Sequence, residues 1–89
     1  MADREPTAAE MLQRAGRALN PTDDWRARLA HDLGINPNSV RQLVTGHLTV
    51  RNDHIESVLR LVEQRVTDLA RVERELRAWL DRHQDPGQA

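Results

Sequence analysis

Apolar residues recur at intervals of three and four positions along most of the chain, which is the period of an amphipathic helix. Residues that end helices interrupt this pattern at Asn20-Pro21, at Gly34 and at Gly46, and so divide it into four segments. No stretch alternates apolar and polar residues in the way that a half-buried strand does. The pattern therefore predicts an all-α protein with three short helices and one long one.

The first two helices are expected to begin at capping residues. Thr7 and Glu10 have the spacing of a capping box, in which each side chain accepts a hydrogen bond from a backbone N–H group. Thr22 is the expected cap of the second helix, with two acids following in its first turn, where they favour the helix dipole. The apolar positions of these two helices are Met11, Leu12, Ala15, Ala18, Leu19, Trp25, Leu29, Ala30 and Leu33.

A third helix is expected over residues 37–45, because Asn36 is a good capping residue and Pro37 is well tolerated at the first helical position. The helix is expected to end at Gly46, and a short loop over residues 47–52 follows it. The residues expected to be buried in this region are Val40, either Leu43 or Val44, and Val50 of the loop.

One long helix is expected over about residues 53–83, because no proline or glycine occurs within it. Asp53 and Glu56 repeat the capping-box spacing at its start, and a flexible tail, residues 84–89, is expected after it. One apolar stripe with the heptad spacing of a coiled coil, interrupted at Glu73, comprises Ile55, Leu59, Val62, Val66, Leu69, Leu76 and Leu80; a thinner stripe comprises Val58, Leu61, Val72 and Trp79.

The length of this last helix predicts a second subunit. Thirty residues at 1.5 Å each extend about 45 Å, which is more than three short helices can cover. The part from Ile55 to Val62 is expected to pack on the chain's own short helices, and the remainder to pair with a second copy, giving a homodimer. The predicted dimer interface is Val66, Leu69, Val72, Leu76, Trp79 and Leu80.

Composition narrows the class of protein. The chain has 89 residues, of which 38% are hydrophobic, and this is enough for one domain with a modest core. It contains no cysteine, which excludes disulfides and thiolate metal sites. The net charge is −1, but residues 25–51 carry four arginines and a single acid, so one face can be basic toward a polyanion.

Catalytic and metal chemistry find little support in the sequence. The four histidines, at positions 31, 47, 54 and 83, lack the local spacing of metal ligands. There is no glycine-rich phosphate loop and no nucleophile elbow. We therefore expect a non-enzyme without cofactor, metal or small-molecule ligand. No apolar run is long enough for a membrane span and no signal-peptide core is evident, so we expect a soluble, cytoplasmic, nucleoid-associated protein.

Four residues of the second and third helices match a specific pattern. Ala30 is small where two helices cross closely, Gly34 allows a tight turn, and Val40 and Leu43 follow that glycine by six and nine positions. The segment ARLAHDLGINPNSVRQLVTG, residues 27–46, thereby resembles the helix-turn-helix of the phage repressor and Cro superfamily. Short bacterial and phage regulators of this kind are the nearest in pattern.

The resemblance extends over about residues 25–51, and the flanking helices share only its general layout. It departs at Leu43, where these regulators often have tryptophan. It also departs at Asp23 and Asp24, near the start of the second helix, where such folds usually approach a phosphate.

The resemblance implies that the third helix enters the major groove while the second crosses the DNA backbone. Arg41 is expected to bond guanine O6 and N7, and Gln42 or Asn38 to bond adenine N6 and N7. Asn36 has the alternative of acting only as a helix cap, and Arg28 of solvating a face. The outward positions are Asn36, Pro37, Asn38, Ser39, Arg41, Gln42 and Thr45; phosphate contacts are expected from Ser39, His47, Arg51, Arg26 and Arg28.

The sequence thus predicts a helix-turn-helix domain over residues 1–52, with its motif at about 22–46, and a dimerisation helix over 53–83. The implied function is sequence-specific binding of double-stranded DNA by a dimeric transcriptional regulator, in particular a repressor of phage or mobile-element genes. The alternative is a helical interaction or assembly protein, such as a small terminase-like subunit that oligomerises in DNA packaging.

Overall fold

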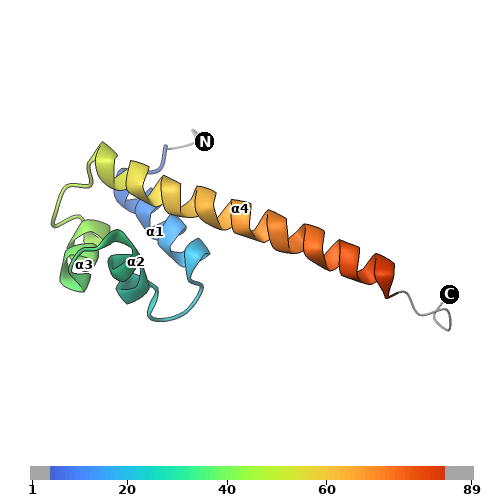
Figure 1. Ribbon diagram of the computed structural model, residues 1–89. Coiled ribbons are helices and arrows are strands. Elements are labelled where there is room, and N and C mark those ends of the chain that lie inside the picture. The colour runs from blue at the N-terminus through green and yellow to red at the C-terminus, as the bar shows by residue number, and fades with distance from the viewer. Residues whose placement is uncertain (1–4, 84–89) are drawn as a thin grey trace.

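The computed structural model describes residues 5–83 and contains four helices, α1 (Ala8–Leu19), α2 (Trp25–Leu33), α3 (Pro37–Thr45) and α4 (Asn52–Arg82). No strand occurs among these residues, so the predicted all-α class with a long last helix is confirmed. α1 and α2 pack against the first half of α4, α3 packs on α1 and α2, and the second half of α4 projects beyond them (Figure 1). The predicted tail, residues 84–89, lies outside the described residues.

Local sequence sets the start of α1 and of α3. Thr7 Oγ1 accepts from the Glu10 N–H at 3.1 Å, and Glu10 Oε1 accepts from the Thr7 N–H at 2.8 Å, so the predicted capping box is present. Asn36 Oδ1 accepts from the Asn38 N–H at 2.8 Å, and Pro37 is the first residue of α3. These ends are predictable because the groups that make them lie within three residues of one another.

The predicted cap of α2 is wrong. Asp24 holds the N-cap position, and the first turn of the helix contains no acid. The Thr22 hydroxyl donates to the Asp24 carboxylate instead of accepting from a backbone N–H of the helix. This side-chain hydrogen bond therefore stabilises the turn between α1 and α2, and α2 begins without a side-chain cap.

The predicted capping box of α4 is also wrong. The helix begins at Asn52, so Asp53 already lies inside its first turn and does not cap it with Glu56. His54 Nδ1 accepts from the backbone N–H of Arg51 at 3.0 Å. This ring nitrogen satisfies the orphan donor at the helix start, which is the task that the sequence pattern assigned to a carboxylate.

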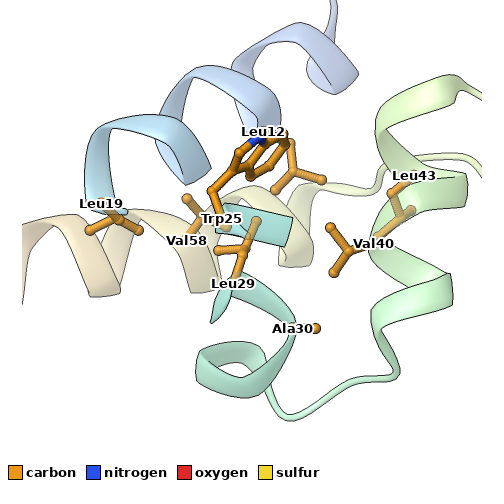
Figure 2. Close-up of a cluster of buried hydrophobic side chains, with 8 residues drawn as sticks. All are labelled: Leu12, Leu19, Trp25, Leu29, Ala30, Val40, Leu43 and Val58. Carbon is orange, nitrogen blue, oxygen red and sulfur yellow. The ribbon is translucent and has the colours of Figure 1, made fainter. Parts of the chain in front are cut away.

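The hydrophobic core lies between the three short helices and extends to the first half of α4 at Val58. Leu33, Val44 and Val50 are half-buried against it, so α3 buries Leu43 rather than Val44. The buried side chains, drawn in Figure 2, are Leu12, Leu19, Trp25, Leu29, Ala30, Val40, Leu43 and Val58.

Trp25 packs against α1 at Gly16, a contact that the apolar periodicity does not indicate. An ideal Cβ added to Gly16 would lie 2.5 Å from Cε3 and 2.6 Å from Cζ3 of the indole. Real Cβ atoms do not approach carbon so closely. Gly16 therefore lets α1 and α2 come together over the largest side chain of the core.

Gly16→Ala is expected to destabilise the protein by about 1–3 kcal/mol, because overpacking a filled core costs that much, more than the roughly 1 kcal/mol that alanine gains over glycine in a helix. Chemical unfolding monitored by circular dichroism measures the change. In a Trp25→Phe background, the smaller ring leaves room and the same substitution should cost much less. An equal cost in both backgrounds would contradict the contact as the cause.

The environment of α4 changes along its length. Val58 is 4% exposed, and Arg65 Nη1 donates to the Leu19 carbonyl at 3.0 Å, which ties α4 to the C-terminal end of α1. Every residue from 71 to 83 is exposed. Within residues 5–83, no helix is long and apolar enough to cross a membrane.

Of the stripe residues that the short helices were expected to bury, Ile55 and Val62 are half-buried, whereas Leu59 is 52% exposed. Adjacent helix residues point about 100° apart, so Leu59 faces away from the body when Val58 faces into it. One apolar position in the packed half of α4 is thus left uncovered.

Candidate nucleic-acid interface

α2 and α3 are joined by a tight turn at Gly34. This residue has φ 72°, in the left-handed region that favours glycine. The Gly34 N–H donates to the His31 carbonyl at 3.1 Å, and the Ile35 N–H donates to the Ala30 carbonyl at 3.0 Å, which completes the end of α2. Ala30 and Val40 are both 0% exposed, as close packing of α2 on α3 requires.

The outward face of α3 carries side chains that engage nothing within the described residues. Arg41 and Asn38 are exposed, and Gln42 is half-buried. Between residues 5 and 83, none of these three side chains has a hydrogen-bond or ionic partner. Their amide and guanidinium groups therefore remain available to a ligand that approaches α3.

The remaining predicted positions of α3 differ in their freedom. Asn36 is committed to its cap, which supports the structural role left open for it. Pro37 is exposed and Ser39 is half-buried. Thr45 donates to the Arg41 carbonyl at 2.9 Å, and its Oγ1 lies 2.8 Å from His47 Nδ1, so these two side chains order the end of α3.

The predicted phosphate-contacting arginines all have local partners. Arg28 Nε lies 3.6 Å from an Asp24 carboxylate oxygen, and Arg51 Nε lies 3.5 Å from one of Asp53. Arg26 lies over the Trp25 ring at 4.7 Å from its centroid. The pairs of Arg28 and Arg51 are exposed, and exposed ion pairs are worth only about 0–1 kcal/mol, so a phosphate can compete for these two arginines.

Asp24 is the acid most strongly held at this surface. The hydrogen bond from the Thr22 hydroxyl lowers the pKa of Asp24 below its ordinary value, and the nearby Arg28 guanidinium lowers that pKa further. The group therefore stays ionised at neutral pH, beside the start of α2. A negative charge at this place disfavours a phosphate contact immediately next to it.

Two features near this surface were missed from the sequence. Arg17 of α1 lies 5.7 Å from the centroid of the Trp25 ring, on the same hollow as Arg26, and adds a second guanidinium there. The second feature is a groove of about 420 Å³ between α3 and the loop before α4. It is lined by Ile35, Ser39, Leu43, Leu48, Thr49, Arg51 and His54. Both features lie close to Trp25 or to α3 only in the folded chain, so the sequence alone does not indicate them.

The predicted residues thus lie on α2, α3 and the following loop, but Arg26 and Arg28 border two different hollows, one shared with Arg17 and the other with Arg65. Within residues 5–83, no group of histidine, aspartate and glutamate side chains is arranged to hold a metal ion. Comparisons with protein-family models, with curated proteins and with solved structures find no match to this chain.

Proposed function

We propose that the protein is a sequence-specific double-stranded DNA-binding regulator in which α2, the Gly34 turn and α3 form a helix-turn-helix. In this proposal α3 enters the major groove, and α2 crosses the backbone. The physiological role that fits best is a repressor of phage or mobile-element genes, acting in the cytoplasm on the nucleoid.

The observation that carries this proposal is the unengaged polar face of α3. Arg41 has the planar fork that bonds guanine O6 and N7 together, and Gln42 and Asn38 have the amides that bond adenine N6 and N7. A polar face opposite a buried side is usual for a surface helix, so the proposal depends on these residue types and on their having no partner within the described residues. Val40 and Leu43 supply that buried side.

The surroundings of α3 support a polyanionic ligand. Residues 25–51 contain four arginines and one acid, Asp32, although the whole chain carries a net charge of −1. Arg17 adds a further cation beside the start of α2, in a hollow that Asp23 also lines. Local positive charge with a polar reading face is the combination that duplex DNA requires.

The projecting half of α4 supports a dimer as the binding unit. Its apolar side chains, 45–61% exposed in one chain, are too many to leave in water without a partner. A second copy brings a second α3, which suits an operator with two related half-sites. The exposed apolar half of α4 is also consistent with the alternative of an assembly protein. High-order rings that bind no palindromic site would support that alternative.

Selection from a random duplex pool provides a cognate site on which to test the proposal. Arg41→Ala and Gln42→Ala are each expected to weaken binding to that site by about 1–3 kcal/mol, or roughly 5- to 150-fold, because each removes a bidentate base contact. Neither should change binding to unrelated duplex appreciably. Fluorescence anisotropy with both duplexes measures the two effects.

Arg51→Ala is the matched control, since a phosphate contact carries no sequence information and its loss should weaken both duplexes alike. Unchanged affinity of Arg41→Ala for the selected site would place the reading surface elsewhere. Failure of the pool to enrich any sequence, with binding absent even at low salt, would remove DNA as the ligand.

A further inference from the structure

The exposed apolar residues of α4 define one stripe, which is interrupted at Glu73. Leu59, Val66, Leu69, Leu76 and Leu80 lie at alternating spacings that keep them on one side of the helix. Each is 52–61% exposed, although each is a large aliphatic side chain. The stripe begins within the packed half of α4 and runs nearly to its end, so the face that the body leaves uncovered is longer than the projecting part alone.

Glu73 occupies one core position of this stripe and limits how two stripes can meet. In a parallel, in-register pair, each core residue faces its own copy, so two Glu73 carboxylates would meet in an apolar layer. Arg77 Nη2 lies 3.0 Å from Glu73 Oε2 in the same chain and offsets only part of that repulsion. An antiparallel pair instead sets the two kinds of core position against each other.

The residues beside the stripe also distinguish the two orientations. A parallel pair would place Arg65 beside Ala70 and Val72 beside Arg77, which matches no opposite charges. In an antiparallel pair with Val66 level with Leu76 of the partner, Glu63 and the partner's Arg77 flank the stripe on the same side and lie two residues, or about 3 Å, from level. By symmetry this ion pair forms twice.

We infer that two copies of α4 associate as an antiparallel pair, with Val66 of one protomer opposite Leu76 of its partner. Leu69 then packs against the partner's Glu73 methylenes, and the two Val72 side chains meet beside the twofold axis. The inference rests on the dimer in the proposed function, but it does not depend on DNA binding.

This orientation determines where the two reading helices lie. The bodies that carry α3 sit at opposite ends of the α4 pair rather than side by side. Equivalent points such as the two Val58 residues are then separated by about 39 Å along the helix axis, from about 26 residues at 1.5 Å each. This distance separates the packed halves of the two α4 helices, not the α3 helices themselves; half-sites one DNA turn apart are separated by roughly 34–36 Å.

Cysteine cross-linking tests the orientation in the full chain, which contains no native cysteine. Val66→Cys and Leu76→Cys are made separately, and each is oxidised alone and in an equal mixture. The antiparallel pair should cross-link only in the mixture, since identical positions lie about 15 Å apart along the axis, beyond the reach of a disulfide. Non-reducing gels measure the cross-linked fraction, which should approach the half expected for mixed dimers.

A parallel pair would cross-link in each single variant, and that result would overturn the inference. A dimer by sedimentation that cross-links in none of the three samples would also overturn it, because the stripe would not be the interface. A monomer by sedimentation would remove the dimer as well. None of these samples contains DNA, so failure here is distinct from failure of DNA binding.

Charge exchange gives an independent test that leaves the core unchanged. A Glu63→Arg chain mixed with an Arg77→Glu chain should form mixed dimers in clear excess over half, because only the mixed dimer restores both ion pairs. Glu75→Arg in place of Glu63→Arg is the matched control, since Glu75 lies away from the stripe, and it should give no excess. A statistical mixture from the first pair, measured by mass spectrometry of the intact dimers, would contradict the antiparallel arrangement.

Discussion

Raising the salt concentration from 50 to 200 mM is expected to weaken binding of the dimer to duplex DNA by about 10³- to 10⁵-fold. This is the loss for a protein that makes roughly six to ten phosphate contacts, because each contact releases condensed counterions at a slope of about −0.9. Arg17, Arg26, Arg28 and Arg51, doubled by the second subunit, are the cations that we assign to these contacts. Anisotropy titrations over this salt range give the slope.

The exposed ion pairs within the chain reduce the expected salt dependence but do not abolish it. Arg28 and Arg51 must leave Asp24 and Asp53 to reach a phosphate, and each of those pairs is weak in water. Circular dichroism at each salt concentration serves as the control that the protein stays folded. A nearly flat dependence of log affinity on log salt would contradict a phosphate-backbone interface, and with it the proposed function.

The helix boundaries that the sequence predicted correctly depend on short-range contacts. Thr7 with Glu10, and Asn36 with Pro37, make their caps from residues within three positions, and Gly34 and Gly46 both adopt positive φ where the pattern ends helices. Such contacts form in nearly the same way in any surrounding fold. The all-α class and the long α4 follow from the same local information.

The wrongly predicted helix caps occur where a neighbouring side chain makes a hydrogen bond that the usual capping patterns do not include. Thr22 donates to Asp24 instead of capping α2, and His54 accepts the N–H at the start of α4 in place of a carboxylate. The contact of Gly16 with Trp25 joins two helices and has no signature in periodicity. This contact depends on how α1 packs on α2, and the pattern within a single helix carries no information about that packing.

The candidate site was only partly predictable for the same reason. The residue types on α3 and their outward direction follow from helical spacing, and the structure places Arg41 and Asn38 on the exposed face as expected. That Arg26 lies over Trp25, and that Arg17 joins it from another helix, depends on how α1 crosses α2. The assignment of DNA to this surface stays a prediction.

The double variant Leu76→Asp, Trp79→Ala is expected to be monomeric at micromolar concentration, where the wild type is expected to be dimeric. Leu76 is 60% exposed and Trp79 is 52% exposed in the single chain, so neither supports the fold of its own body. A carboxylate buried opposite an aliphatic layer is costly, and truncating a large aromatic at an interface costs about 2 kcal/mol or more. Sedimentation of both proteins measures the difference.

Loss of the dimer should weaken DNA binding, although α3 is unchanged. When one subunit is bound, its partner meets the second half-site at an effective concentration in the millimolar range, and linkage of this kind strengthens binding by about 10²- to 10⁴-fold. The double variant should therefore lose that factor on a two-half-site duplex but keep wild-type affinity for a single half-site. Comparing the two duplexes separates lost linkage from a damaged reading surface.

Ala78→Asp is the matched control, because residue 78 lies on the opposite side of α4 from the stripe and receives the same new charge. It should remain dimeric and bind both duplexes as the wild type does. A dimer that persists in the double variant would place the interface outside the projecting half of α4. A wild-type mass near 10.2 kDa would mean that the apolar stripe stays in water, and the two-half-site advantage should then be absent from the wild type as well.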